Sequence, residues 1–561
     1  MLHVRFKAIF RHLTHFTLVA ILVGSFSTAA SAQETVEFGK KKTFALTGPY
    51  CDGSPNSTGP VCTSMATLSY ATIFVPGPKG YQMIIRPIFW DGDGNLGNKG
   101  NQYKFNIVPW TKGYHYAFVA SVLPQLSGRQ FIFKVVDAVN PTGFAASGPI
   151  RESGKGYYVT VKDGIQTTRF NAGRNDPEAL MGTDYTQAER LRLVRDTADL
   201  KLSNQYFHTD NFKAGATNTG NKVTMAVGTN KTEILRNRAK GVLSLKRLRD
   251  LEEVLDLSDE LGVATDLVVW DNDLNTNMDF TSYLWNLMGR VPGLGINWIL
   301  IEEWDKTHSR TEMEGFVKTL KAFLGVYPQR VGQHLSTLAK AKEEFTKLKP
   351  HVPLAWQYIG AAALTPLSLT PTFFNTETID ILRDYTLGKE VMHWSEVPRV
   401  INPVTARDKL RKRITYPSAF GGAGAIDVHF KEEVTNFYAL WDIWGDLATL
   451  RRFFQSFGNE LLNMDPANQR VRFVTRQSGE AVFGFGTPFT PNGKIAFAAY
   501  VTNGEDVEID FSGAGSRRFR IDYIDPTTGT VGETFYVQSD NDWKLFKTYP
   551  TFDTLIKVES E

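Results

Sequence analysis

Segments with the pattern of buried strands alternate with segments of helical periodicity between residues 165 and 457. Leucines recur at helical spacing over 245–261, Gly262 follows as a stop signal, and an apolar strand is predicted over 263–270. The same order of helix and strand then recurs. It is predicted at 312–325 and 330–334, at 338–348 and 354–358, and at 378–387 and 390–396. This alternation favours a (β/α)8 TIM barrel.

Both flanks of the predicted barrel have the pattern of all-β domains. Residues 35–160 contain short β-rich runs separated by turn signals, which is typical of a small β-sandwich. After residue 457 seven strands are predicted, at 471–474, 480–484, 494–501, 507–511, 517–523, 533–537 and 555–558. A chain of 561 residues is long enough for several domains. We divide it into a signal peptide at 1–32, an N-terminal β-sandwich at 33–162, the barrel at 163–462 and a C-terminal β-sandwich at 468–561.

The N-terminal residues have the order of a secretory signal peptide. Arg5, Lys7 and Arg11 precede an apolar run at 16–23, and small residues offer a cleavage site after Ala32. The apolar run is shorter than the roughly 20 residues of a membrane-spanning helix. We therefore expect an exported protein, either periplasmic, secreted or at the cell surface. We expect no stable membrane insertion once the signal is removed.

Cysteine content, net charge and the missing motifs exclude several classes of function. Cys51 and Cys62 are the two cysteines of the chain, and export predicts that they form one disulfide. Residues 91–95 resemble a calcium loop, but Leu96 stands where an EF-hand needs glycine, so we predict a turn and no metal. The 62 basic and 59 acidic residues give a net charge of +3, which leaves no electrostatic footprint for nucleic acid. The motifs of zinc proteases, serine hydrolases and nucleotide-binding enzymes are missing from the sequence.

Two adjacent carboxylates follow the predicted strand at 295–301. The active sites of (β/α)8 barrels lie at the carboxyl ends of the strands, so either Glu302 or Glu303 is a candidate catalytic acid. The alternative is that such a carboxylate caps the next helix.

A further carboxylate, Glu396, ends the strand predicted at 390–396. If the strand at 295–301 is the fourth of the barrel, the strand before Glu396 is the seventh, and these two strands face each other across the mouth. Retaining glycosidases use two carboxyl groups about 5 to 5.5 Å apart, one as nucleophile and one as acid and base. The pattern therefore predicts a glycosidase site that needs no cofactor.

The order of these motifs resembles that of secreted bacterial glycoside-hydrolase-like proteins. In that family an immunoglobulin-like domain precedes an apiosidase-like barrel, and a collagen-binding-type β domain comes last. The resemblance implies that Glu396 is the nucleophile. It places the acid/base on Glu303, although Glu302 stands where the wider clan has asparagine, so both glutamates remain candidates.

The same resemblance extends to the fifth, sixth and eighth strands. Residues 327–334 are similar to the fifth strand and end in His334, Trp356 and Gln357 are similar to the end of the sixth, and 413–429 is similar to the glycine-rich eighth. His334 and Gln357 are therefore candidate substrate contacts, and the alternative for His334 is a packed or hydrogen-bonded histidine without a role in binding.

Tryptophans supply candidate stacking surfaces for a sugar. Trp304 and Trp394 flank the candidate carboxylates, and Trp270 ends the preceding predicted strand. The leading hypothesis is a secreted glycoside hydrolase that cleaves a poly- or oligosaccharide with Glu303, or Glu302, and Glu396. The alternative is a non-catalytic carbohydrate-binding or surface adhesion protein on a degenerate barrel.

Overall fold

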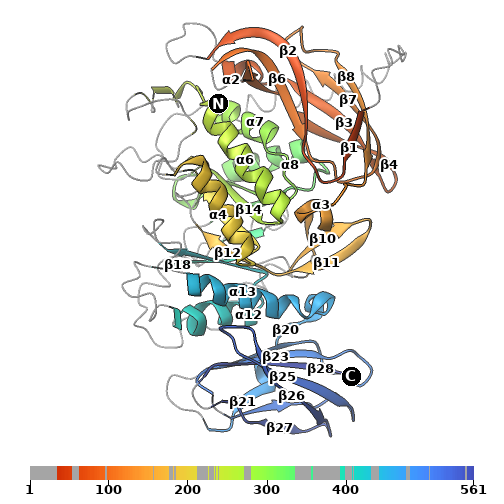
Figure 1. Cartoon of the computed structure of the whole chain (residues 1–561), viewed down its shortest axis with the longest axis vertical. Coiled ribbons are helices and arrows are strands. Elements are labelled where there is room, and N and C mark those ends of the chain that lie inside the picture. Colours follow the sequence, from red (N-terminus) through yellow and green to blue (C-terminus); the bar gives the residue numbers. More distant parts are fainter. Residues whose placement is uncertain are drawn as a thin grey trace. The chain divides into compact units, whose positions relative to one another are not determined.

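The computed structural model describes most of the chain in two compact units (Figure 1). The first unit comprises Met1–Ile150, Glu178–Arg195 and Phe207–Val331, and the second comprises Arg151–Pro177, Asp196–Tyr206 and Gly332–Glu561. The described residues are 34–53, 62–94, 98–153, 155, 157–175, 181, 185–210, 225, 233, 236–237, 239–270, 280–302, 304–334, 355–357, 392–397, 407–408, 410–430, 441–475, 481–504, 506–549 and 552–561.

Two β-sheets form an N-terminal β domain within the first unit. One sheet has the order β1–β8–β7–β3–β4, and the other has the order β2–β6–β5. The strands are β1 (Glu34–Glu37), β2 (Lys42–Asp52), β3 (Tyr70–Gly77), β4 (Gly80–Pro87), β5 (Phe89–Gly92), β6 (Lys99–Ile107), β7 (Gly113–Ala120) and β8 (Gln130–Val136). Phe44 of β2 contacts the rings of Phe131 and Phe133 of β8, with centroids 5.0 and 5.1 Å away. These contacts between the sheets make the core of the domain.

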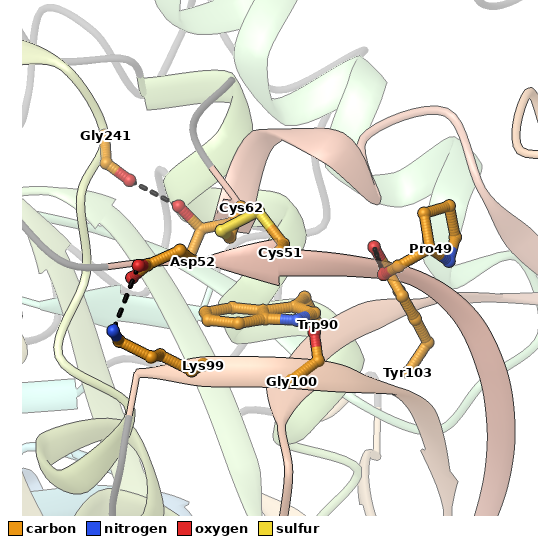
Figure 2. Close-up of a disulfide and its surroundings, with 10 residues drawn as sticks. Pro49, Cys51, Asp52, Cys62, Trp90, Lys99, Gly100, Tyr103 and Gly241 are labelled. Atoms are coloured by element: carbon orange, nitrogen blue, oxygen red, sulfur yellow. Dashed lines mark hydrogen bonds and ion pairs between the residues drawn. A yellow bond between two sulfur atoms is a disulfide. The ribbon is translucent and has the colours of Figure 1, made fainter. Parts of the chain in front are cut away.

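A disulfide joins the end of β2 to the short helix α2 (Cys62–Met65), as Figure 2 shows. The Cα atoms of Cys51 and Cys62 are 5.7 Å apart. The indole of Trp90 on β5 is buried and donates its Nε1 hydrogen to the carbonyl of Gly100 (Figure 2). The bond therefore ties the end of β2 to α2.

The first unit also contains strands and helices of the alternating region. They are α6 (Leu245–Leu261), β14 (Ala264–Trp270), α7 (Phe280–Arg290), β15 (Ile296–Ile301), the 3-10 turn η1 (Trp304–Lys306) and α8 (Arg310–Leu324). Ser244 caps α6 by accepting from the amide of Arg247, and Gly262 ends it in the left-handed region at φ 72°. β14 and β15 pair in parallel, with Val268 opposite Ile299. Both strands are almost entirely buried, as expected of a parallel sheet covered on both faces.

Charged side chains fix the N-terminal β domain to α6 and α7. The carboxylate of Asp91 accepts from Arg290 at 3.1 Å and from Arg249 at 3.2 Å, and Lys104 also contacts it. Arg290 donates in addition to Glu252 at 2.6 Å. Asp91, which was predicted in a turn, instead lies in β5 and is a buried anchor between the β domain and the helices, while the turn begins at Asp93.

Parallel strands of the second unit have the order β13–β12–β19–β18, and β16 pairs in parallel with β17. These strands are β12 (Asn171–Asn175), β13 (Asn204–His208), β16 (Arg330–His334), β17 (Ala355–Gln357), β18 (Met392–Val397) and β19 (Ala425–Phe430). The helices near them in sequence are α4 (Gln187–Asp199), α12 (Tyr416–Phe420) and α13 (Trp441–Gln455), with the π turn η3 (Arg411–Thr415). Counted along the described chain from β12 to β19, β15 is the fourth strand and β18 the seventh.

Smaller elements connect the N-terminal β domain to this region and continue after α13. They are α3 (Gly143–Ser147), β9 (Ile150–Glu152), β10 (Tyr158–Lys162), β11 (Ile165–Arg169), η5 (Gly458–Asn463) and η6 (Asn468–Arg470). The predicted helices at 338–348 and 378–387 lie outside the described residues. No helix in the described part of the chain is both long and apolar enough to cross a membrane.

A C-terminal β domain completes the second unit. Its sheets have the orders β20–β22–β23–β28–β25–β26 and β21–β24–β27. The strands are β20 (Asp465–Pro466), β21 (Val471–Phe473), β22 (Val482–Gly486), β23 (Ala496–Val501), β24 (Val507–Asp510), β25 (Arg518–Ile524), β26 (Val531–Gln538), β27 (Trp543–Phe546) and β28 (Thr554–Ser560). All seven predicted strands are confirmed, and the short β20 and β27 were not predicted. Phe511, Phe519 and Phe546 meet in the core between the two sheets.

Candidate functional site

Glu302 stands immediately after β15, where its amide donates to the carbonyl of Trp270 at 2.9 Å. Its carboxylate Oε2 lies 3.2 Å from Nε2 of His208, the last residue of β13. The His208 side chain is 1% exposed and the Glu302 side chain 14% exposed. A carboxylate at the carboxyl end of β15 is therefore held by a buried imidazole and keeps some access to solvent.

Hydrogen bonds fix the backbone that follows His208. The amide of Thr209 donates to the carbonyl of Val268 at 2.8 Å, and its hydroxyl accepts from Tyr283 at 2.8 Å. Because β14 and α7 both hold Thr209, the preceding imidazole has little freedom to leave Glu302.

Glu302 is not the cap of the helix that follows it. The N-cap of α8 is Ser309, whose hydroxyl accepts from the amide of Glu312 while the Glu312 side chain accepts from the amide of Ser309. The described chain thus supplies α8 with its own capping box, and the carboxylate of Glu302 contacts His208 instead.

The two described candidate tryptophans differ in exposure. Trp304 in η1 is 2% exposed, which leaves little ring surface for a sugar. Trp270 is half-buried at the end of β14, with its ring centroid 5.6 Å from that of His308. Burial lowers the pKa of His308, which favours a neutral imidazole beside the indole. Trp270 therefore offers the more accessible aromatic surface.

In the second unit one register row crosses the carboxyl ends of four strands. Glu396 of β18 is opposite His429 of β19, His429 is opposite Asn175 of β12, and Asn175 is opposite Tyr206 of β13. We name these four residues the carboxyl-end row. The Tyr206 hydroxyl lies 3.2 Å from Nδ1 of the buried His334, and His334 is opposite Gln357 in the pairing of β16 with β17. The strand pairing thus brings the backbone of Glu396 to the same level as Tyr206.

A buried polar pair lies two residues below this row. Asn204 donates its amide hydrogen to Asp427 at 2.6 Å, across Gly173 of the strand between them. A Cβ atom at Gly173 would lie 2.5 Å from the Asp427 carboxylate, so only glycine leaves room for the contact. In the first unit Asn297 donates to Asp266 in the same way, at 2.6 Å. These pairs fix the strands below the candidate site.

The side chains of several predicted site residues lie outside the described part of the chain. Glu303 lies outside the described residues, and so do the side chains of Glu396, Trp394 and Gln357. Sequence reasoning missed His208 and Tyr206. The available signal was the run Asn204 to His208, in which two polar residues, two aromatic residues and a histidine precede Thr209 and Asp210. The described residues contain no group of three or more potential metal-ligating side chains.

Comparison with solved structures identifies similar folds. A candidate glycoside hydrolase from Bacteroides vulgatus ATCC 8482 aligns with a TM-score of 0.63 at 12% identity, over 94% of this chain and 100% of that chain. A protein described as a glycoside hydrolase aligns with a TM-score of 0.56 at 13% identity, over 75% and 98%. A family 5 glycoside hydrolase from Bacteroides vulgatus ATCC 8482 aligns with a TM-score of 0.55 at 14% identity, over 75% and 95%.

Comparisons at the level of sequence give no relative. No protein-family model matches the chain, and no curated protein matches it. At 12 to 14% identity the structural likeness establishes the fold alone, so the chain has the fold of glycoside hydrolases.

Proposed function

We propose that this protein is a glycoside hydrolase with a closed (β/α)8 barrel, acting on a poly- or oligosaccharide. The observation that carries the proposal is the contact between His208 and Glu302 at the carboxyl end of the fourth strand. It is supported by Glu396, which occupies the carboxyl-end row on the seventh strand. Two carboxylates on these strands suit hydrolysis with retention of configuration.

In this mechanism Glu396 is the nucleophile. Its carboxylate attacks the anomeric carbon while the acid protonates the leaving oxygen, so the glycosidic bond breaks as the glycosyl-enzyme ester forms. The same acid, now a carboxylate, removes a proton from water, which hydrolyses the ester and restores both side chains. The product keeps the anomeric configuration of the substrate.

The environment of Glu302 favours the assignment of Glu303, and not Glu302, as the acid/base. A general acid must be neutral when the leaving group departs. The carboxylate of Glu302 is already engaged by the buried imidazole of His208 at 3.2 Å, which limits its freedom to reach a leaving oxygen. Glu302 is therefore better suited to orient the substrate, and Glu303 is the preferred acid/base.

The remaining candidates are proposed to contact the substrate or to support residues that do. Gln357 is proposed to contact a sugar hydroxyl, whereas His334 and Tyr206 are fully buried and are proposed to hold the strand end next to it. Trp270 offers a ring edge or face for stacking, and Trp394 is proposed as a second platform.

Export of the protein is also a proposal. The disulfide between Cys51 and Cys62 supports an oxidising location, such as the periplasm or the cell exterior. The mass of the mature protein tests this, because cleavage after Ala32 leaves Gln33 as the first residue.

Hydrolysis of polysaccharides tests the function. Plant, algal and bacterial polysaccharides are incubated with the full-length protein, and new reducing ends are measured. Activity that disappears in Glu396→Gln and persists in the exposed control Glu533→Gln supports the proposal. NMR of the first-formed anomer separates retention from inversion. Binding of a polysaccharide without new reducing ends would favour the non-catalytic alternative.

A further inference from the structure

The five-stranded sheet of the N-terminal β domain carries several exposed aromatic and aliphatic side chains on its outer face. Along each strand alternate residues point to opposite faces. The inner face is marked by the buried residues Ile73, Ile84, His115, Ala117 and Phe133, so on each strand the residues that alternate with them lie on the outer face. We name six of these outer residues the aromatic face: Phe74, Tyr81, Met83, Tyr114, Tyr116 and Ile132.

Strand register aligns four of these side chains in one row. Met83 of β4 is opposite Phe74 of β3, Phe74 is opposite Tyr116 of β7, and Tyr116 is opposite Ile132 of β8. Neighbouring strands are about 4.8 Å apart, so the row spans roughly 14 Å. The strands β4, β3, β7 and β8 that carry it can be followed in Figure 1. The row is long enough for several ring-sized contacts in succession.

Contacts within the face hold its rings in place. The rings of Tyr81 and Tyr116 meet nearly edge to face with centroids 5.6 Å apart, and Phe74 meets Phe118 in the same way at 6.0 Å. Rings that support one another lose little conformational freedom when a ligand binds. The face is therefore largely ordered before any partner arrives.

The exposed surface is large enough for a ligand but small for a stable dimer. Tyr81 is 54% exposed, Met83 and Tyr114 are each 42% exposed, and Ile132 is 40% exposed. On side chains of about 200 Å² these fractions leave roughly 350 Å² of accessible surface on the four residues. A stable dimer buries about 800 Å² on each partner. The area thus argues against a second copy of this chain as the occupant.

The charge of the face selects the class of ligand. None of its six residues is charged, and one cation, Lys134, lies with its Nζ 5.8 Å from the centre of the Tyr114 ring. Nucleic acid and acidic polymers require several basic side chains. Tyrosine rings combine an apolar surface with a hydroxyl, which suits the apolar faces and hydroxyl groups of sugar rings.

We propose that the aromatic face binds an uncharged polysaccharide chain and is a binding site separate from the catalytic residues. The choice of a polysaccharide over another neutral polymer rests on the proposed function. Such a site keeps the enzyme on its polymer between cleavage events and raises the local concentration of substrate. It contributes little to the turnover of short soluble oligosaccharides.

Sedimentation with insoluble polysaccharides tests this site. Full-length protein carrying Glu396→Gln is mixed with crystalline cellulose, chitin, insoluble xylan and any polymer that the hydrolysis assay identifies. The pair Tyr81→Ala and Tyr114→Ala should weaken retention on the bound polymer by about tenfold, because two stacking rings are lost. The corresponding Tyr→Phe pair should keep most of the retention. Tyr50→Ala is the matched control, since Tyr50 is 66% exposed on β2 of the other sheet.

Further readouts separate the possible outcomes. With Glu396 intact, the alanine pair should leave kcat/KM on a short oligosaccharide unchanged. The single variant Tyr81→Ala guards against misfolding of the pair. The loss of one ring, worth about 0.7 kcal/mol, should weaken retention on the polymer threefold or more.

Absence of retention on every polymer, or an equal loss in Tyr50→Ala, overturns the proposal. So does a dimer in analytical ultracentrifugation that the alanine pair dissociates. If Glu396→Gln leaves hydrolysis intact, the proposed catalytic mechanism fails, while selective loss of retention still supports the aromatic face.

Discussion

The imidazole of His208 and the carboxylate of Glu302 meet at 3.2 Å although they are far apart in the sequence. His208 ends β13 and Glu302 follows β15, so the contact joins the carboxyl ends of two strands that are separated along the chain by β14. Thr209, the residue after His208, hydrogen-bonds to Val268 and Tyr283, so the backbone next to the imidazole is also fixed. A buried base that contacts a candidate catalytic residue in this way acts as a positioning residue.

Replacement of His208 by alanine should lower kcat/KM for the identified polysaccharide by about a hundredfold, because a small displacement of a carboxylate is costly to catalysis. The lost side chain leaves a cavity, and added imidazole should partly refill it and restore activity. Steady-state kinetics with and without imidazole measure the effect. A variant with a native thermal midpoint and native kcat/KM would show that His208 has no positioning role.

The acid/base can be assigned by separate replacement of Glu302 and Glu303 with glutamine. Loss of the proton donor should spare substrates with an acidic leaving group, such as a nitrophenyl glycoside. Azide should then partly restore turnover, because a small anion attacks the glycosyl-enzyme without a general base. We expect this rescue for Glu303→Gln and a uniform loss for Glu302→Gln. Rescue of the Glu302 variant instead would exchange the two roles.

Local patterns made the strands and helices of the fold predictable. The leucine spacing and Gly262 predicted α6 at its observed bounds, Leu245–Leu261, and the apolar run before Glu302 predicted β15. Each signal lies within one element, where periodicity and caps are determined by neighbours in the sequence. β27 was not predicted because Trp543 to Phe546 is a short run in which apolar and polar residues do not clearly alternate.

Long-range polar contacts were not predictable. Asp91 was expected in a turn, yet it binds Arg249 and Arg290, which lie 158 and 199 residues away. His208 gave no sign of its contact with Glu302. Such pairs depend on which strands and helices become neighbours, and the periodicity of a single segment does not contain that information.

Removal of the buried cation at Arg290 should destabilise the first unit. Burial alone would raise the pKa of Asp91, but the charges of Arg290, Lys104 and Arg249 hold that pKa below its usual value. Arg290→Met removes the most deeply buried cation of the cluster and leaves Asp91 with Lys104 and Arg249, and Glu252 with Lys41. The expected loss is therefore about 3 kcal/mol in the free energy of unfolding, at the low end for a broken buried ion pair. Urea denaturation measures it.

The exposed pair of Arg472 and Glu508 provides the control for that experiment. Arg472 is 57% exposed and its Nη2 lies 2.7 Å from Glu508. Arg472→Met should therefore cost less than about 1 kcal/mol. Equal effects of the two replacements would show that the Asp91 cluster is not a buried anchor.

The disulfide should be fully formed in the exported protein. Thiol titration of the unfolded, unreduced chain should detect no free cysteine, because Cys51 and Cys62 are the only two. Replacement of both by serine should cost about 3 kcal/mol, the loop-closure entropy of a loop of this length. Two free thiols in protein isolated from its host would contradict the proposed oxidising location.

Stability should fall as the pH rises towards 7 because of Asp259, at the end of α6. Burial raises the pKa of Asp259 to about 7, although the amides of Leu294 and Gly295 donate to its carboxylate at 2.7 and 3.1 Å. Asp256 raises this pKa further and Lys41 lowers it. The folded protein thus holds a proton that the unfolded chain releases near pH 4.

The sign of the pH dependence follows from this difference in bound protons. Between about pH 4 and pH 7 the folded state binds more protons than the unfolded state, so the free energy of unfolding decreases with rising pH. The contribution is complete below the unfolded pKa and is lost as the pH passes the folded pKa of about 7. A shift of this size corresponds to at most about 4 kcal/mol.

Asp259→Asn cannot ionise, so its thermal midpoint should change less than that of the wild type between about pH 5 and pH 8. Asp525→Asn is the control, because hydrogen bonds from Thr527 and Thr528 outweigh partial burial and lower the pKa of Asp525. An unchanged slope in Asp259→Asn, with Asp525→Asn also unchanged, would mean that Asp259 is ionised in the folded protein and that the amides before β15 compensate for its burial.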